Sequence, residues 1–565
     1  MLPTCLISDL KIFRPGDSTK HLANELSCSE LAAGVIEMLK GNEDIETLRE
    51  WIHPDFAKQM DSLNLGEGSK AAKSLWESKS SLGNVLVYGD YDTDGISSTV
   101  LAMEIFRNKA AQVRYFIPRR DVHGYGLNAG ILDKIAVSGC NTLIVTDCGT
   151  NDSEMLQKLR DKGINVFVFD HHSVSAPVTI PTIVNPCINI EAGDHQKICA
   201  TAVLWCWAWK ENIVSRKFLQ YEIDLVTLAT IADCMPLHNL NRSLIRYGMR
   251  LMRSNPRRGL AALFDCLSIN KSQLTEEHLS MRVIPCLNAP GRIATADTGV
   301  RALLGAGSSD NVYDCVNELV RINRKRQSLT EAIVDEIDKA ITKDKIKSNV
   351  LYNEQWPIGV LSGVASRVCA QYNRPIVLAA PTGSKVIRGT LRVPEGGDAV
   401  GILREIKDKL DAWGGHKFAA GFSVLTENWR DVRSELERML NNIVIQPESA
   451  TPVIDIRPSE ISISDWRAVS ELGPFGNSSA TPKFYTNHNP SGFEIFTMGK
   501  KSEHAYLRDN NTKLLAFNTT ASDVNELRLM GRLKGWIYHP RLDYWRNEEQ
   551  LQFIIDCAVT SEGGV

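Results

Sequence analysis

The sequence lacks the features that mark several large classes of protein. No two of its thirteen cysteines form a C-x-x-C pair, and their number is odd. This pattern argues against a disulfide framework or a thiolate zinc site and predicts reduced thiols. The chain has no apolar run long enough to cross a bilayer and no secretory leader, so we expect a cytoplasmic protein without a membrane anchor. Low-complexity tracts and repeats of fixed period are also absent.

An excess of charge of one sign is missing as well. The 565 residues have a formal net charge of −3, which excludes a global attraction to nucleic acid and leaves only local patches for such binding. The hydrophobic content of 43% and the charged content of 23% are those of an ordinary globular protein. The length is too great for a single hydrophobic core and predicts three or four domains.

What the sequence does contain is a change in the spacing of its apolar residues near residue 80. Helical patterns come first, and short apolar runs separated by amphipathic stretches follow. Strands that alternate with helices predict an α/β fold with a doubly wound, mostly parallel sheet. In such sheets, ligands bind beyond the carboxyl ends of the strands. The predicted strands are 84–89, 112–118, 141–147, 164–170 and 181–186.

Acidic and histidine side chains follow several of these apolar runs. Carboxylates with one or two imidazoles suit Mn²⁺ or Mg²⁺ better than metals that thiolates select. Several carboxylates are also what two cations held about 3.5–4 Å apart require for phosphoryl displacement. We therefore expect one edge of the sheet to gather a two-metal site. Its candidate residues are Asp90, Asp92, Asp94, Asp147, Asp170, His171, His172 and Asp233.

Each of these signals has a simpler explanation when it is taken alone. The stretch DYDTD could be a solvated turn or could imitate a calcium loop, although it lacks the downstream glutamate of an EF-hand. The two histidines could be a helix cap and a packed ring, and Asp147 could be an N-cap. Asp233 could pair with Arg242. Their joint occurrence in one fold unit favours the metal site.

Four ordered motifs, DYDTDG, VTDCGT, FDHH and IADCMPL, resemble those of the DHH phosphoesterase superfamily. Further motifs resemble its RecJ branch, namely HGYGLN, NAPGR, LSGVASR, RGTLR, GGHKFAAG and GPFGNSSATPKF. The resemblance implies a DHH domain, a smaller α/β DHHA1 domain joined to it by a long helix, and a C-terminal OB-type β-barrel. The expected boundaries are 1–80 for an N-terminal helical region, 81–265 for the DHH domain, 266–345 for a helical connector, 346–445 for the DHHA1 domain and 446–565 for the OB-fold domain.

The same resemblance implies an activity. It is that of a single-stranded-DNA-specific 5′→3′ exonuclease of DNA repair and recombination, which releases mononucleotides with two divalent ions, Mn²⁺ or Mg²⁺. By position, the implied metal ligands are Asp92, Asp94, Asp147, His171 and Asp233, with Asp94 and Asp147 best placed to contact both ions. The implied catalytic set is Asp90, Asp94, Asp147, His172 and Arg292, in which His172 faces the scissile phosphate and Arg292 contacts a phosphate.

The chain departs from the family pattern at three positions, of which Tyr88 bears on how one metal is held. Tyr88 stands where many relatives have histidine, Pro357 replaces the histidine of a Trp-His pair, and Thr390 replaces a serine. We read these departures as those of a divergent but active member. The predicted nucleic-acid contacts are Arg120, Asn288, Arg292, Arg324, Arg367, Thr390, Arg392 and His416.

Two later segments suit a polymer substrate. The stretch 321–346 predicts a long helix whose basic first half would follow a phosphate backbone without sequence choice; the alternative is a solvated linker helix. The C-terminal strands predict a small β-barrel. Its Tyr538, Tyr544 and Trp545 would stack on bases or form its core.

Two other functions stay open. A DHH enzyme can instead hydrolyse short oligonucleotides, cyclic dinucleotides or pyrophosphate, but the barrel and the basic helix favour a polymer. An inactive single-strand-binding scaffold would have lost motif acids that this chain keeps. We expect single-stranded DNA as the partner, with single-strand-binding protein and a helicase as further candidates, no membrane contact, and a monomer.

Overall fold

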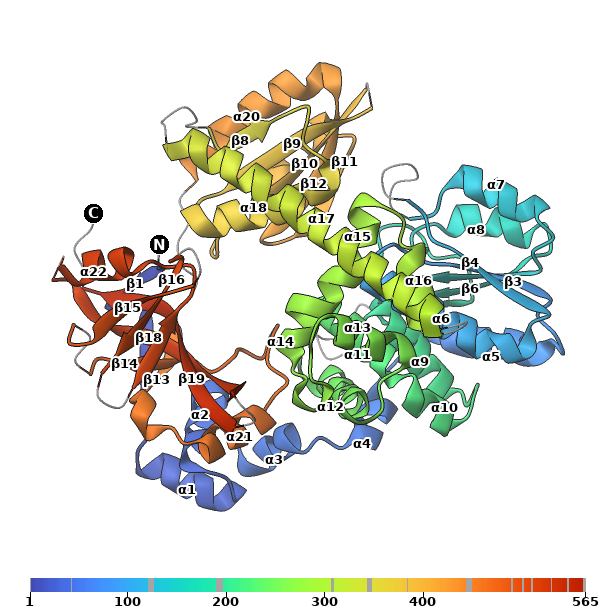
Figure 1. The fold of residues 1–565 in the computed structure, drawn as a ribbon. Coiled ribbons are helices and arrows are strands. Elements are labelled where there is room, and N and C mark those ends of the chain that lie inside the picture. The colour runs from blue at the N-terminus through green and yellow to red at the C-terminus, as the bar shows by residue number, and fades with distance from the viewer. Residues whose placement is uncertain are drawn as a thin grey trace. The chain divides into compact units, whose positions relative to one another are not determined.

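Strands and helices of the chain were assigned in a computed structural model (Figure 1). Contacts divide the chain into two units, which we describe separately: Met1–Gln59, Leu237–Asn239 and Ser449–Val565 form the first, and Met60–Pro236 and Leu240–Glu448 form the second. The structure describes residues 2–41, 43–119, 126–188, 197–305, 309–342, 348–383, 385–443, 450–488, 491–499, 502–509, 512–529, 531–545 and 548–561.

The predicted parallel sheet lies in the second unit. Its five strands run in the order β4-β3-β5-β6-β7, and every pair is parallel. All five residues of β5 are buried, as expected for a strand covered on both faces. Figure 1 shows helices α7 and α8 on one face and α5 and α6 on the other. The bounds are α5 Glu67–Ser78, β3 Asn84–Tyr88, α6 Thr93–Phe106, β4 Gln112–Phe116, α7 Ala129–Val137, β5 Thr142–Thr146, α8 Ser153–Arg160, β6 Asn165–Phe169 and β7 Ile183–Val184.

This strand order places a topological switch between β3 and β5. The chain leaves β3 for β4 on one side, and it leaves β5 for β6 on the other side. The diverging connections open a crevice at the carboxyl ends of the two strands, where ligands of doubly wound sheets bind. The acidic motifs follow these two strands in the sequence.

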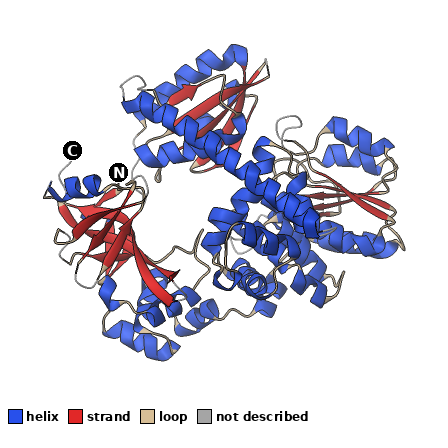
Figure 2. Cartoon of the chain, in the orientation of Figure 1, coloured by secondary structure: helices blue, strands red, loops and turns tan. Residues whose placement is uncertain are grey.

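Helices dominate the next part of the unit (Figure 2). Helices α9 and α11 are apolar around most of their circumference and almost completely buried, as core helices are. The predicted long helix is present as α17, which starts earlier than expected and runs for 34 residues. The bounds are α9 Ala200–Lys210, α10 Arg216–Tyr221, α11 Ile223–Ala232, α12 Asn239–Ser254, α13 Arg258–Cys266, α14 Glu276–His278, a π-helix Leu279–Val283, α15 Ile284–Ile293, α16 Asp297–Leu304 and α17 Ser309–Thr342.

A second, smaller sheet completes this unit. Its strands run in the order β11-β12-β10-β9-β8, with β8 parallel to β9 and the other pairs antiparallel. Helix α18 packs with the strand β9 and with the long helix α17 around a shared apolar cluster. The bounds are β8 Val350–Tyr352, α18 Ile358–Tyr372, β9 Ile376–Thr382, β10 Val386–Arg392, α19 Ala399–Glu405, β11 Ala412–His416, β12 Ala419–Leu425 and α20 Trp429–Asn442.

The first unit joins the two ends of the chain in one sheet of nine strands. The order is β15-β16-β17-β19-β18-β14-β13-β2, and β1 pairs with β19. A mostly helical region was expected before residue 80, and these two N-terminal strands are too short to give a clear alternating pattern. The bounds are β1 Thr4–Leu6, β2 Leu10–Phe13, α1 Asp17–Leu26, α2 Glu30–Lys40, α3 Ile45–Ile52, α4 Phe56–Ser62, β13 Thr451–Asp455, α21 Ile463–Glu471, β14 Phe484–Thr486, β15 Glu494–Met498, β16 His504–Arg508, β17 Lys513–Ala516, α22 Ala521–Leu529, β18 Leu533–Trp545 and β19 Glu548–Thr560.

One base-stacking candidate in this sheet belongs to its core. Tyr538 is fully buried, and its hydroxyl donates to the carbonyl oxygen of Ile456 at 2.8 Å. The prediction that Tyr538 stacks on bases is therefore wrong, and the alternative core role holds. The side chains of Tyr544 and Trp545 lie outside the described part of the chain. Within the described ranges, no helix has both the length and the apolar character that crossing a membrane requires.

Candidate metal centre

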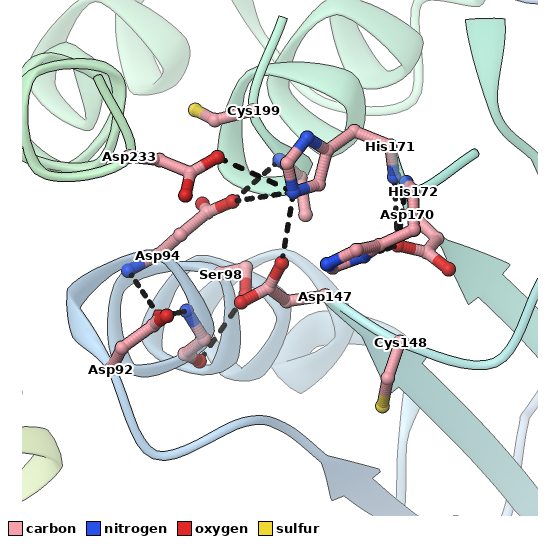
Figure 3. A network of polar contacts seen from close by, with 12 residues as sticks. Asp92, Asp94, Ser98, Asp147, Cys148, Asp170, His171, His172, Cys199 and Asp233 are labelled. Atoms are coloured by element: carbon pink, nitrogen blue, oxygen red, sulfur yellow. Dashed lines mark hydrogen bonds and ion pairs between the residues drawn. The ribbon is translucent and has the colours of Figure 1, made fainter. Parts of the chain in front are cut away.

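Three neighbouring strands and one helix deliver the predicted acidic and histidine side chains to one place (Figure 3). The aspartates of DYDTD follow β3, Asp147 follows β5, the Asp-His-His triplet follows β6, and Asp233 caps the C-terminus of α11. They form three overlapping groups, and within each group the ligand atoms lie within 4.8 Å of one another. The groups are Asp90, Asp92 and Asp147; Asp94, His171 and Asp233; and Asp147, His171 and His172.

The turn after β3 is held by hydrogen bonds on both of its inner carboxylates. Asp92 is the N-cap of α6, and its Oδ1 accepts from the N–H groups of Asp94 and Gly95 at 3.0 and 3.1 Å. Asp94 is 1% exposed. Its two oxygens accept from the N–H groups of Ala200 and Thr201 at 2.7 and 2.9 Å, and Oδ1 also accepts from the Thr201 hydroxyl at 2.5 Å. The N-terminus of α9 thus stabilises the negative charge of Asp94.

His171 lies at the centre of the cluster. Its Nε2 is 3.2 Å from Asp147 Oδ1, 3.4 Å from Asp233 Oδ2 and 3.8 Å from Asp94 Oδ2. Figure 3 shows its ring between these three carboxylates. Asp147 has a φ of 62°, a left-handed conformation that costs free energy in a non-glycine residue and recurs at functional sites.

Asp170 orients the second histidine. Its Oδ1 accepts from the N–H groups of His171 and His172 at 2.8 and 3.2 Å and lies 2.7 Å from His172 Nδ1. Its Oδ2 accepts from the N–H of Thr150 at 3.0 Å. Burial disfavours the charged ring, but the Asp170 carboxylate outweighs it and raises the pKa of His172 to about 9. A carboxylate on one ring nitrogen fixes the direction of the other.

The crowded carboxylates raise one another's pKa. Burial, followed by the charges of Asp94 and Asp92, raises the pKa of Asp147 well above its usual value and the pKa of Asp233 to about 8. Burial and Asp94 also raise the pKa of Asp92.

Bound cations would relieve the repulsion between these carboxylates, so the cluster fits a cation site. Asp233 Oδ2 is buried without a hydrogen-bond partner. Two of the three groups combine carboxylate oxygens with imidazole nitrogens, and both include His171. Such ligands suit hard divalent ions. The residues that could hold such ions are Asp90, Asp92, Asp94, Asp147, His171, His172 and Asp233.

Tyr88, which stands in the place of a family histidine, makes its hydrogen bond outside the carboxylate cluster. Its ring is fully buried, and its hydroxyl donates to the carbonyl oxygen of Gly126 at 3.1 Å. The metal-capable groups among the described residues form without it. The departure at Tyr88 therefore leaves the carboxylate cluster intact.

Of the residues predicted to contact the strand end, Arg392 and His416 are less buried than the carboxylate cluster. Arg392 is half-buried, and it donates from Nη1 to Thr390 Oγ1 at 2.8 Å and from Nε to Ser366 Oγ at 2.9 Å. Arg392 and His416 are both paired in register with Ala419. The end of β10 and the hairpin β11–β12 thus bring Thr390, Arg392 and His416 together.

The other predicted contacts are more scattered. Arg292 donates to Ser362 Oγ at 2.8 Å, and Asn288 accepts two hydrogen bonds from Thr93. Arg367 on α18 and Arg324 on α17 are exposed, and their contact with nucleic acid stays a prediction. Arg120 lies outside the described residues.

Sequence reasoning missed the residues that support the cluster. Thr201 is separated from Asp94 by 107 positions, so no local pattern connects them. Thr150 lies in the motif VTDCGT, but the motif gives no sign of its contact with Asp170. Asp170, which was expected among the candidate residues of the metal site, instead orients His172.

Three family models match the chain. The model for the DHH family, N-terminal domain, matches residues 84–235. The model for the DHHA1 domain matches residues 345–442, and the model for the RecJ OB domain matches residues 454–556. All the residues of the carboxylate cluster lie in the first of these matches.

Similar proteins span most of the chain. The single-stranded-DNA-specific exonuclease RecJ of Bacillus subtilis is 25% identical over 563 residues, which are 98% of this chain and 71% of the relative. The crystal structure of RecJ with Mn²⁺ from Thermus thermophilus superposes with a TM-score of 0.78 at 22% identity and covers 99% of this chain and 81% of that one. A structure of exonuclease RecJ bound to manganese has a TM-score of 0.55 at 27% identity and covers 68% of this chain and 96% of that one.

Proposed function

The chain belongs to the RecJ family by its DHH, DHHA1 and RecJ OB domains, and we propose that it is a single-stranded-DNA-specific exonuclease that degrades strands in the 5′→3′ direction. The observation that carries this proposal is the gathering of two overlapping carboxylate–histidine groups at the switch point between β3 and β5. The relatives named above act on single-stranded DNA, and two of the similar structures were solved with manganese.

In this proposal Asp92, Asp94, Asp147, His171 and Asp233 hold two divalent ions, Mn²⁺ or Mg²⁺. When bound, such a pair supplies a hydroxide nucleophile at neutral pH and stabilises the charge on the attacking and leaving oxygens. The chain's own part is to fix the ligands in advance: the N-terminus of α9 holds Asp94, and the cap of α6 holds Asp92. His172, oriented by Asp170, would donate a hydrogen bond to a non-bridging phosphate oxygen.

The second sheet would bind the strand end. Arg392 and Thr390 offer a guanidinium and a hydroxyl, the chemistry that binds phosphate through charge-assisted hydrogen bonds. Arg292 would contact the phosphate nearer the cluster. Release of mononucleotides follows if the end site and the metal site are one nucleotide apart along the strand.

The biological setting is a further part of the proposal. A DNA repair or recombination role in the cytoplasm, action as a monomer, and supply of the strand by a helicase and single-strand-binding protein all follow the family resemblance. The thirteen cysteines are free in the structure, which suits a reducing compartment.

An end-labelled degradation assay tests the function. Purified protein would be titrated with Mn²⁺ and Mg²⁺ on single-stranded DNA, a blunt duplex, a duplex with a 5′ single-stranded tail, single-stranded RNA and a cyclic dinucleotide. We expect rapid release of mononucleotides from single strands and 5′ tails and poor digestion of the blunt duplex. A 5′ label should appear first as a mononucleotide, and a 3′ block should not slow the reaction.

Other outcomes would replace the proposal. Equal rates on blunt duplex and 5′ tail would exclude strand selection. Preference for the cyclic dinucleotide would make the chain a small-substrate phosphodiesterase. Tight binding of single strands without turnover in Mn²⁺ would make it an inactive scaffold.

A further inference from the structure

Helix α15 docks on the turn that carries two of the candidate metal ligands. The carboxamide oxygen of Asn288 on α15 accepts from both the N–H and the hydroxyl of Thr93, each at 2.8 Å. Thr93 is fully buried and lies between Asp92 and Asp94. One acceptor, 195 positions away in sequence, therefore holds the residue between the two carboxylates.

This contact completes the cap of α6. The first N–H groups of a helix have no partner within the helix. Asp92 accepts from the second and third of them, those of Asp94 and Gly95, and Asn288 accepts from the first, that of Thr93. The turn thus depends on α15 for an acceptor to the N–H of Thr93. Loss of that acceptor would leave a buried donor unpaired, which costs free energy in the folded turn.

A second contact lies one turn further along α15. A Cβ atom on Gly291 would lie 2.4 Å from the carbonyl oxygen of Tyr91, so only glycine permits this approach. Tyr91 precedes Asp92 and Thr93 follows it. Helix α15 therefore holds the backbone on both sides of Asp92.

The C-terminal end of α15 also meets α18. A Cβ atom on Gly359 would lie 1.8 Å from the carbonyl oxygen of Arg292, and Arg292 Nη1 donates to Ser362 Oγ at 2.8 Å. The C-terminal half of α15 thus packs both on the metal-side turn and on α18. This gives the long-range contact to Thr93 a rigid support.

From these contacts we propose that Asn288 is a positioning residue, which holds the turn of Asp92 and Asp94 in the conformation that binds the cations. The inference rests on the proposed two-cation function. It differs from the nucleic-acid contact predicted for Asn288, because the carboxamide oxygen is used twice within the protein. An amide suits this place, since it accepts hydrogen bonds without adding another negative charge beside the carboxylates.

The first test is isothermal titration of the full-length protein with Mn²⁺ in the absence of DNA. Asn288→Leu removes the acceptor at similar size, and we expect its Mn²⁺ Kd to rise by about 10- to 100-fold, as for other residues that orient metal ligands. Asn288→Asp keeps an acceptor oxygen although it adds a negative charge, and it should bind Mn²⁺ more tightly than Asn288→Leu does, because the acceptor holds the turn.

A matched control comes from a buried asparagine on a neighbouring helix that contacts α15. Asn323 on α17 donates from Nδ2 to Cys286 Sγ at 3.4 Å, and it is 7% exposed. Asn323→Leu removes a contact to α15 that lies away from the metal-side turn, and its Mn²⁺ affinity should match that of wild type. Unfolding midpoints in EDTA would show whether each variant is folded.

Steady-state kinetics separate positioning from DNA contact. At saturating Mn²⁺, Asn288→Leu should lower kcat and leave the KM for single-stranded DNA within about twofold, because the turn and not the strand is affected. A raised KM with unchanged Mn²⁺ affinity would overturn the proposal and make Asn288 a DNA contact. An unchanged Kd and kcat would overturn it as well.

Two further outcomes are informative. If Asn288→Leu does not fold, Thr93→Val provides the test, because it removes one of the two hydrogen bonds. It should raise the Mn²⁺ Kd by about threefold. An unchanged Kd would refute the inference. If the wild-type protein itself takes up no Mn²⁺, the proposed function fails. If the wild-type protein binds Mn²⁺ and the Asn288 and Thr93 variants bind it equally well, only the positioning role fails.

Discussion

The carboxylate cluster and the strand-end residues of the second sheet are built in opposite ways. In the cluster, Asp94, Asp147 and Asp170 are at most 4% exposed, and backbone N–H groups bind Asp94 and Asp170. In the second sheet, His416 is exposed and Arg392 is half-buried. The hydrogen-bond partners described for the Arg392 side chain are two hydroxyls and one carbonyl.

This difference indicates which site stabilises the transition state and which site mainly binds the substrate. A buried cluster with fixed donors is organised before the reaction, so its interactions act on the transition state at no further cost of reorganisation. A half-buried arginine is partly screened by water and loses side-chain freedom when it binds. We therefore expect changes in the cluster to lower kcat and changes in the second sheet to raise KM.

The largest effect should come from Asp147, which belongs to two of the three metal-capable groups. Asp147→Asn removes one charge from the cluster, and we expect turnover in Mn²⁺ to fall by about 10³-fold, because the cations supply several kcal/mol of transition-state stabilisation. Turnover on labelled single-stranded DNA measures the loss. Binding of the same DNA, followed by anisotropy, should change little.

A stability measurement supplies the control for Asp147→Asn. Burial and neighbouring carboxylates raise the pKa of Asp147 well above its usual value, so a neutral amide relieves repulsion in the protein without cations. The unfolding midpoint in EDTA should equal or exceed that of wild type. Wild-type turnover by the metal-replete variant would remove Asp147 from the site.

A smaller effect in the same region should come from Thr201, which contacts Asp94 through its N–H and its hydroxyl. Thr201→Val keeps the shape and removes the hydroxyl, and the Mn²⁺ Kd should rise by about tenfold, since residues that orient ligands tune metal affinity. Thr201→Ser, which keeps the hydroxyl, should restore most of the affinity. Equal Kd values for the valine and serine variants would show that the hydroxyl does not contribute.

How far the sequence predicts each region follows from the range of its contacts. The cluster could be predicted because parallel strands place their carboxyl ends at one edge, so that Asp92, Asp147 and His171 converge once the strands are recognised. The supporting contacts could not, because Thr201 and Asn288 approach the turn from 107 and 195 positions away. No periodic pattern encodes such pairs.

The N-terminal segment shows a second limit. Three- and four-residue strands leave too few positions for an alternating pattern. Leu10–Phe13 is paired with Thr451–Asp455, and Thr4–Leu6 with the last strand, so the partners stand at the other end of the chain. The expectation of a mostly helical region before residue 80 did not include them, whereas the long amphipathic helix α17 was found because its pattern is local and repeated.

The smallest of the three effects should come from Arg392, on the exposed side of the comparison. Arg392→Ala removes a guanidinium that would bind the 5′-phosphate, and we expect the KM for 5′-phosphorylated single strands to rise by about five- to tenfold, the value of one charge-assisted hydrogen bond after screening. The kcat should stay within about twofold, because the carboxylate cluster is unchanged. Steady-state rates on matched 5′-phosphate and 5′-hydroxyl oligonucleotides measure both constants.

The 5′-hydroxyl substrate decides how Arg392 acts. If its guanidinium reads the terminal phosphate, the wild-type protein should discriminate between the two ends and the alanine variant should not, since the hydroxyl end offers no charge to bind. If both substrates lose the same factor, Arg392 contacts an internal phosphate instead. A fall in kcat with KM unchanged would mean that the exposed residue acts on the transition state, and the division between a buried catalytic region and an exposed binding region would not hold.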